Sequence, residues 1–345
     1  MPKEREWYLR PTVDAILPTQ DGKNVIISGG ENIDIWDVVS REPVHSFTEL
    51  ADSDSPYHWD HLALTPDGKY LFGASRGEGN IYCWDMERRV RIPRKGSGIT
   101  GIYGIALTPD GKQLVAGWEP YPWGDDSRFK RRLKIFDTGG FFNEGFFGKL
   151  TNFGRKPYGR FDTLPDVLTY TYIESKLKNP EYLALSPDGK WLAVGCGYDG
   201  TTTVWNFETK EVQCVLRNNY SGVLTFTPDS KYLIVAHQTM DEMGVFDIAS
   251  KRFPFSFLSG ANPDDGYYVT GKDVTTISIS SDGRFLAATS PSKYIRLWRW
   301  DKPEEIETVH TVDAFMRCCA FVPNSNLLVA GDDFGHVHFM DLKGM

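Results

Sequence analysis

Apolar and polar residues alternate in short stretches along the chain, and tight turns separate these stretches. Around Pro66-Asp67-Gly68-Lys69, for example, Leu62 and Leu64 precede the turn and Leu71 follows it, with smaller or polar residues between them. Alternation with a period of two predicts β-strands. Because proline, aspartate and glycine supply the backbone angles of a chain reversal, the segment predicts two antiparallel strands joined by a tight turn.

The same arrangement recurs seven times with a period of about 43 residues, which is typical of arrays whose units bury their apolar faces against one another. Each turn is followed by an apolar stretch that ends in a characteristic pair of residues. The turns are Asp21-Gly22-Lys23, Pro66-Asp67-Gly68-Lys69, Pro109-Asp110-Gly111-Lys112, Pro187-Asp188-Gly189-Lys190, Pro228-Asp229-Ser230-Lys231, Ser281-Asp282-Gly283-Arg284 and Pro323-Asn324-Ser325-Asn326. The closing pairs are Trp36-Asp37, Trp84-Asp85, Phe136-Asp137, Trp205-Asn206, Phe246-Asp247, Trp298-Arg299 and Met340-Asp341.

Each closing pair ends a predicted third strand, and a more polar fourth strand, such as Val212 to Leu216, follows most of them. These turns and pairs resemble those of the WD40-repeat β-propeller family, in which four antiparallel strands form one blade. The resemblance covers the chain from Val13 to Leu342. It implies an all-β fold, a seven-bladed β-propeller of four-stranded antiparallel blades.

The last repeat ends at Leu342, directly after its third strand, whereas Trp7 to Arg10 form an extended segment outside the repeats. We therefore expect this N-terminal strand to be the outer strand of the seventh blade. Such pairing would close the ring and remove an exposed strand edge.

The repeats account for residues 1–345 as a single propeller domain with insertions at about 119–130, 139–179 and 260–273. In a four-stranded blade, the loop between strands two and three leaves the same rim as the connection to the next blade. The positions of the insertions therefore predict that all three project from one face. Within the longest insertion, residues 163–178 fit either an extra strand or a short helix.

The net charge of −8 argues against general attraction to nucleic acid or to anionic membranes. Residues 119–180 differ from the rest, because they carry eleven Lys or Arg against eight Asp or Glu, a local balance of +3. We therefore expect a protein partner with an acidic or mixed surface. No apolar stretch is long enough to span a bilayer and no signal-peptide core follows Met1, so we expect no membrane association and a cytoplasmic location.

Signatures of catalysis are missing from the sequence: it has no phosphate-binding loop, nucleophile elbow, zinc-protease helix or Cys-x-x-Cys pair. Five scattered cysteines imply no disulfide framework. His336 and His338 share one face of the last strand near Asp332-Asp333, which fits a metal pair. A solvated strand face is the interpretation we favour, so we expect no catalytic residue, metal or cofactor.

The sequence thus predicts a non-enzymatic interaction scaffold whose insertions bind a protein partner, because aromatic residues and arginine dominate protein-binding hot spots. Two alternatives stay open: a nucleic-acid-associated subunit of a complex, and a small-ligand sensor or propeller enzyme that uses the central channel. The candidate partner-binding residues are Trp59, Trp118, Tyr121, Trp123, Arg131, Arg132, Tyr158, Arg160, Phe161, Tyr267 and Tyr268.

Overall fold

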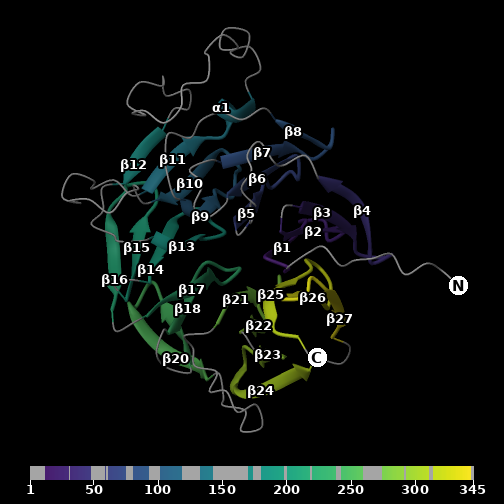
Figure 1. The fold of residues 1–345 in the computed structure, drawn as a ribbon. Helices are drawn as coiled ribbons and strands as arrows, with labels where there is room; N and C mark the ends of the chain where they lie inside the picture. The colour runs from purple at the N-terminus through teal and green to yellow at the C-terminus, as the bar shows by residue number, and fades with distance from the viewer. Residues whose placement is uncertain are drawn as a thin grey trace, which may run out of the picture.

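The predicted strands form seven antiparallel sheets in the computed structural model, arranged as the blades of a ring (Figure 1). The structure describes residues 12–30, 32–47, 59, 61–74, 81–92, 102–118, 133–142, 170–173, 180–197, 200–217, 220–237, 242–258, 274–290, 293–310 and 314–342. The predicted fold class, a seven-bladed β-propeller, is confirmed.

Each blade takes its strands in chain order. Blade 1 contains β1 (Ala15–Pro18), β2 (Asn24–Gly29), β3 (Asn32–Asp37) and β4 (Glu42–Phe47), and blade 2 contains β5 (His61–Leu64), β6 (Tyr70–Ala74), β7 (Ile81–Asp85) and β8 (Val90–Ile92). Blade 3 contains β9 (Ile102–Leu107), β10 (Gln113–Trp118), β11 (Leu133–Asp137) and β12 (Tyr170–Ile173), and blade 4 contains β13 (Pro180–Leu185), β14 (Trp191–Cys196), β15 (Thr201–Asn206) and β16 (Val212–Leu216). Blade 5 contains β17 (Tyr220–Phe226), β18 (Tyr232–His237), β19 (Glu242–Asp247) and β20 (Arg252–Leu258), and blade 6 contains β21 (Thr276–Ile279), β22 (Phe285–Thr289), β23 (Tyr294–Arg299) and β24 (Lys302–His310). Blade 7 contains β25 (Met316–Phe321), β26 (Leu327–Asp332) and β27 (Val337–Asp341), and a short helix, α1 (Gly139–Phe142), follows β11.

The first strand of each blade lies nearest the centre of the ring and the fourth lies outside (Figure 1). Blade 7 has three strands among the described residues, and β27 is its outermost. The expected fourth strand, Trp7 to Arg10, lies outside the described residues, so closure by the N-terminal strand stays a prediction.

Seven apolar clusters lie between the blades, one for each neighbouring pair. They exist because both faces of each sheet are apolar, and successive residues of a strand point to opposite faces. In β3, Ile33 and Ile35 pack against blade 2, whereas Trp36 packs toward blade 7. No blade could bury both faces alone, so burial between blades stabilises the ring.

The ring joins blade 7 to blade 1 through contacts of the segment that precedes β1. The Val13 N–H donates to the carbonyl oxygen of Asp332 at 3.0 Å. The Val13 side chain is 2% exposed and belongs to a cluster with Val25, Cys318 and Val329. Blades far apart in the sequence therefore share a core.

A hydrogen bond from a hydroxyl to a carboxylate fixes six of the turns between the first and second strands. In blade 2, Thr65 Oγ1 donates to Asp67 Oδ1 at 2.6 Å and accepts from the Tyr70 N–H at 3.0 Å. The same bond, 2.5 to 2.6 Å long, joins Thr19 to Asp21, Thr108 to Asp110, Ser186 to Asp188, Thr227 to Asp229, and Ser280 to Asp282.

The turn of blade 7 differs from these six. Val322 takes the place of the hydroxyl residue, and Asn324 has a φ of +57°, whereas in blade 2 the left-handed residue is Gly68, one position later in the turn, with a φ of +72°. The backbone of the seventh turn therefore differs in conformation from that of the blade 2 turn.

Candidate functional site

The propeller has two rims, which we define by their connections. The turn rim carries the turns between strands one and two and between strands three and four of each blade. The connection rim carries the links between strands two and three and between successive blades. The pairing of residues at the ends of antiparallel strands shows at which rim the chain leaves each sheet. Each connecting segment can therefore be assigned to one rim by the residues that flank it.

Residues 119–132 connect β10 to β11 and are anchored on the connection rim. Gly117 pairs with Leu133, so both anchors lie at the same end of blade 3. Residues 259–273 follow Leu258, which pairs with Glu242 at the equivalent end of blade 5. The anchors of these two insertions therefore agree with the expected common face.

The expectation that the insertion 139–179 leaves the sheet on this face is wrong for the segment between β11 and β12, whereas residues 174–179 link blade 3 to blade 4 on the connection rim. Residues 170–173 form β12, the fourth strand of blade 3, with Tyr170 opposite Phe136 and Ile173 opposite Leu133. The chain therefore leaves the sheet after β11 and re-enters it at Tyr170, both on the turn rim. Of the two structures left open for residues 163–178, a strand is present over Tyr170–Ile173.

Helix α1 fixes the start of this insertion to the turn rim. The Thr138 hydroxyl donates to the carbonyl oxygen of Gly111, in the turn of the same blade, at 2.7 Å. The Phe141 ring is 3% exposed and lies 5.2 Å from Phe72 and 6.2 Å from Phe136, measured between ring centroids. Phe141 therefore belongs to the core between blades 2 and 3.

One candidate contact is a core residue in the structure. Trp59 is 0% exposed and packs edge-on against Tyr82 and Trp84, at centroid distances of 4.9 and 5.2 Å. Its carbonyl oxygen accepts a hydrogen bond from the Ser28 hydroxyl at 2.8 Å. The expectation that Trp59 contacts a partner is therefore wrong, because its ring fills the interface between blades 1 and 2.

Trp118 ends β10 and packs, half-buried, against the cluster between blades 2 and 3. It therefore lies at the base of the 119–132 insertion. The remaining candidate contacts lie outside the described residues: Tyr121, Trp123, Arg131, Arg132, Tyr158, Arg160, Phe161, Tyr267 and Tyr268.

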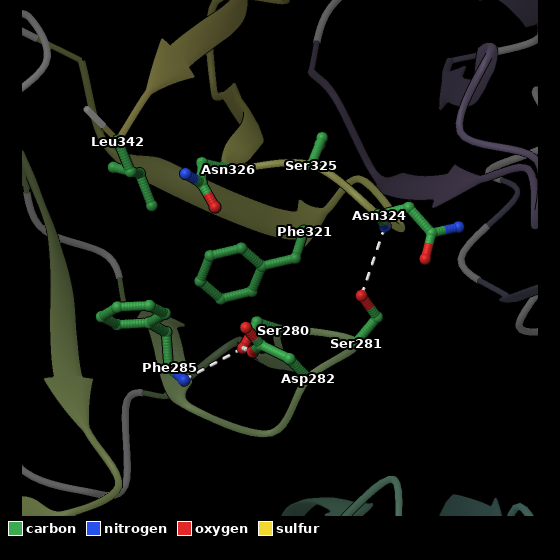
Figure 2. A pocket seen from close by; sticks show the side chains of 9 residues that line it. All are labelled: Ser280, Ser281, Asp282, Phe285, Phe321, Asn324, Ser325, Asn326 and Leu342. Atoms are coloured by element: carbon green, nitrogen blue, oxygen red, sulfur yellow. Dashed lines mark hydrogen bonds between the residues drawn. The ribbon is translucent and has the colours of Figure 1, made fainter. Parts of the chain in front are cut away.

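A cavity of about 280 Å³ lies between blades 6 and 7 on the turn rim, beside the seventh turn (Figure 2). Phe285, Phe321 and Leu342 supply its apolar surface. Its polar surface comes from serine, asparagine and aspartate side chains of the two turns, namely Ser280, Ser281, Asp282, Asn324, Ser325 and Asn326.

One hydrogen bond at this cavity joins the two turns, and another lies within the turn of blade 6. The Asn324 N–H donates to Ser281 Oγ at 3.2 Å, and the Phe285 N–H donates to Ser280 Oγ at 2.9 Å (Figure 2). The described residues that line the cavity include no histidine, cysteine, lysine or arginine. The cavity is thus lined by hydrogen-bonding groups and by three apolar side chains, and its described lining contains no imidazole base and no thiol nucleophile.

Asp332, His336 and His338 form a polar cluster on the connection rim of blade 7. His336 Nδ1 and His338 Nε2 each lie 2.9 Å from Asp332 Oδ2. Burial disfavours the charged carboxylate, but hydrogen bonds from His338 and from the backbone and ring of His336 hold the pKa of Asp332 below its ordinary value. The expected solvated face is correct for His336, which is 63% exposed, and wrong for His338, which is 18% exposed.

The described cysteines are free thiols. Cys318 and Cys319 lie on opposite faces of β25, and both are buried between blades. Burial raises the pKa of Cys319 to about 12 and raises that of Cys318 as well. Because the thiolate is the reactive form, these two thiols are inert packing groups.

Comparison with protein families supports the repeat assignment. A model described as "WD domain, G-beta repeat" matches residues 181–206 and 264–299, and an "Uncharacterised protein domain (DUF2415)" matches residues 313–345. Within the described residues, no helix has the length and hydrophobicity of a transmembrane span.

Several characterised proteins are similar to parts of this chain. Apoptotic protease-activating factor 1 of Rattus norvegicus is 20% identical over 94% of this chain and 28% of its own length. Target of rapamycin complex subunit LST8 of Bos taurus is 25% identical over 43% of each chain. The 77 kDa echinoderm microtubule-associated protein of Strongylocentrotus purpuratus is 23% identical over 80% of this chain and 39% of its own length. The chain therefore spans less than half the length of these relatives.

Among solved structures, the β-propeller domain of Myceliophteria thermophila Cps50 (Swd1) superposes with a TM-score of 0.68 at 14% identity, covering 96% of this chain and 97% of that one. At this identity the likeness concerns the fold, and it extends around the whole ring. The matched repeats and the seven blades are those of a β-propeller, and with this likeness they support assignment of the chain to the WD40-repeat β-propeller family.

Proposed function

We propose that this chain is a non-enzymatic protein-interaction module that binds its partner through the connection rim. WD40 propellers generally act as scaffolds for protein interactions. One similar protein is named as a complex subunit and another as a microtubule-associated protein, which are names of proteins that work bound to other proteins.

The observation that carries the proposal is the common rim of two insertion anchors. Trp118 and Leu133 anchor residues 119–132, and Leu258 anchors residues 259–273, at the same ends of their blades. Blade cores need neither insertion. The anchors belong to paired strands of a packed ring, so the bases of both segments are fixed, and a fixed base reduces the ordering entropy that binding costs.

Charge favours an acidic or mixed partner surface. Residues 119–132 contain Arg128, Lys130, Arg131 and Arg132 against Glu119, Asp125 and Asp126, a local balance of +1 in a chain of net charge −8. Tyr121 and Trp123 in the same segment are residue types that anchor protein interfaces. Arg160 belongs to residues 143–169, which follow β11 and precede β12 in the chain, so it is tested separately from Arg131 and Arg132.

Affinity capture from extracts of the source organism, followed by mass spectrometry, tests this proposal. Replacing Arg131 and Arg132 with Glu should reduce capture of the partner at least several-fold and weaken its salt dependence, since rim charges mainly set the salt-sensitive part of binding. The matched control replaces Lys69 and Lys112 with Glu on the turn rim, where their side chains are 61% and 80% exposed.

Four outcomes contradict the proposal. Loss of capture by the turn-rim control but not by the connection-rim variant would place the functional face on the turn rim, and an Arg160→Glu effect would point to the 143–169 segment there. Recovery of nucleic acid instead of protein would favour the first alternative. A bound small molecule or catalytic turnover would favour the second.

A further inference from the structure

The geometry points to a binding site for a divalent transition-metal ion, best suited to Zn²⁺, formed by Asp332, His336 and His338. His338 lies in β27 and His336 directly precedes this strand, and the side chains of both reach Asp332 Oδ2. Asp332 ends the neighbouring strand β26, where Gly331 pairs with Val337. The chain thus brings two imidazoles and one carboxylate to one corner of blade 7.

The three ligand atoms already converge. His336 Nδ1 and His338 Nε2 are each 2.9 Å from Asp332 Oδ2, and the three atoms all lie within 4.8 Å of one another. In a tetrahedral zinc site with bonds of about 2.0 to 2.1 Å, neighbouring nitrogen and oxygen ligands are about 3.3 Å apart. The two nitrogen–oxygen distances are a few tenths of an ångström shorter than this, so each imidazole nitrogen moves that far from Oδ2 when the ion binds.

The carboxylate is held in place before any ion binds. Asp332 is 0% exposed, and its Oδ1 accepts hydrogen bonds from the backbone N–H groups of Phe334 and His336, both at 2.9 Å. Oδ2 is thereby directed toward the two imidazoles. Hydrogen bonds of this kind orient metal ligands and increase metal affinity.

Each imidazole ligates through a nitrogen that has lost its proton. In the ion-free cluster, hydrogen bonds from both rings to Asp332 Oδ2 require protons on His336 Nδ1 and His338 Nε2. When the ion binds, each proton moves to the other ring nitrogen or leaves to solvent, and Oδ2 exchanges two hydrogen bonds for one bond to the metal.

The neighbouring Asp333 does not join the site, because its Oδ1 accepts a hydrogen bond from the Phe315 N–H at 3.1 Å. The site therefore has three protein ligands. His336 is 63% exposed, which leaves water access to a fourth position. Three ligands and a water molecule form an open zinc site.

The ion would connect the last two described strands beside the junction of the ring. The carbonyl oxygen of Asp332 accepts the Val13 N–H at 3.0 Å, which ties the same residue to the segment preceding β1. Met340, on the same face of β27 as the two histidines, packs into the cluster between blades 6 and 7. The three ligands belong to blade 7, whereas the two insertions of the connection rim are anchored in blades 3 and 5.

Titration of chelator-treated protein with Zn²⁺, in competition with a chromophoric chelator, tests the site. We expect one Zn²⁺ per chain, and a loss of affinity of about 100-fold or more in His336→Asn and in His338→Asn, because each removes a ligand. His336 is the primary test, since its exposure lets the variant fold. Co²⁺ should give the strong visible absorption of a four- or five-coordinate site in the wild type and lose it in His336→Asn.

Matched controls separate this site from casual binding by surface imidazoles. Asp333→Asn removes the adjacent carboxylate, and His45→Gln removes an imidazole from β4, so both should bind Zn²⁺ like the wild type. Zn²⁺ should raise the thermal midpoint of the wild type and of both controls, but not that of His336→Asn. The proposal is overturned if no Zn²⁺ binds stoichiometrically, or if binding is the same in the wild type, His336→Asn and Asp332→Asn.

Discussion

At the scale of single residues, the hydroxyl-to-carboxylate bonds of the turns make the stability of the propeller depend on pH. Each of these turn carboxylates accepts a hydroxyl hydrogen bond, and in most of them the pKa is lowered, as in Asp21, Asp67 and Asp110. A carboxylate whose pKa is lower in the folded state stabilises the fold above its unfolded pKa. This stability is lost as the pH falls through the folded value.

Ser280→Ala should show this dependence most clearly. The Ser280 hydroxyl is the main cause that lowers the pKa of Asp282 from 3.8 to about 2. The variant should lose about 2 kcal/mol of unfolding free energy at neutral pH, about 1 kcal/mol for the bond to Asp282 and about 1 kcal/mol for the bond from the Phe285 N–H, which does not depend on pH. This difference from the wild type should shrink as the pH falls from the ordinary value of 3.8 toward about 2, where Asp282 becomes protonated in the folded wild type.

Thermal unfolding of both proteins across this pH range measures the difference. Ser281→Ala is the control, because the Ser281 hydroxyl accepts from the Asn324 N–H rather than donating to the Asp282 carboxylate. A destabilisation by Ser280→Ala that stays constant with pH would show that the hydroxyl acts without its charged acceptor.

Single residues also show where sequence patterns stop being informative. Trp59 lies in a polar linker, which suggested an exposed contact, but its ring fills the interface between blades 1 and 2. The linker composition contains no signal for this, because the ring packs against Tyr82 and Trp84 of β7, two strands later in the chain. The His-x-His spacing of β27 was visible, whereas the pairing of β26 with β27 was needed to select Asp332 over Asp333.

At the scale of elements, inner strands were predictable and outer ones less so. The alternation around each turn predicted the first two strands, and the second strands are almost wholly buried, as in β2 and β26. Outer strands are more exposed, and Val212 and Val215 of β16 are 55% and 40% exposed. β12 was assigned to an insertion because a long segment separates it from β11 and polar outer strands carry weak alternation.

Turns of neighbouring blades contact one another. Substitutions at two glycines can measure how much this contact contributes to the free energy of unfolding. Gly68 and Gly111 have φ angles of +72° and +70° at equivalent positions. A Cβ at Gly111 would approach Cδ of Pro66 in the preceding blade to 2.8 Å, whereas a Cβ at Gly68 would meet no atom within 4 Å. Gly68→Ala should therefore cost about 1 to 2 kcal/mol of unfolding free energy from backbone strain alone.

Gly111→Ala should cost the same strain and roughly 1 to 3 kcal/mol more, because the proline ring is rigid and the turns must separate. Denaturant unfolding of the two variants compares them directly. Equal losses in both would mean that the turns move apart at no cost, and that contact between them does not stabilise the ring.

At the scale of the whole molecule, the ring depends on the junction of blades 7 and 1. There, Arg41 forms an ion pair with Asp341 at 2.7 Å and lies over the Phe339 ring at 5.8 Å. Beneath this exposed pair, Val13 and Cys318 belong to a shared apolar cluster. A stable junction keeps the two insertions of the connection rim at fixed positions, which rigid presentation of a binding face requires.

Deletion of residues 1–10 tests whether the N-terminal segment supplies the fourth strand of blade 7. Among the described residues, β27 pairs with β26 on one edge and with no strand on the other, whereas the other six blades have a fourth strand there. If Trp7 to Arg10 cover this edge, their loss should lower the thermal midpoint by about 5 °C or more and increase aggregation through the open strand edge. Arg41→Ala is the control, since an ion pair with side chains 45% and 47% exposed contributes at most about 1 kcal/mol. Calorimetry and light scattering follow the two effects, and a midpoint as high as that of the full chain would mean that the N-terminal segment does not close the ring.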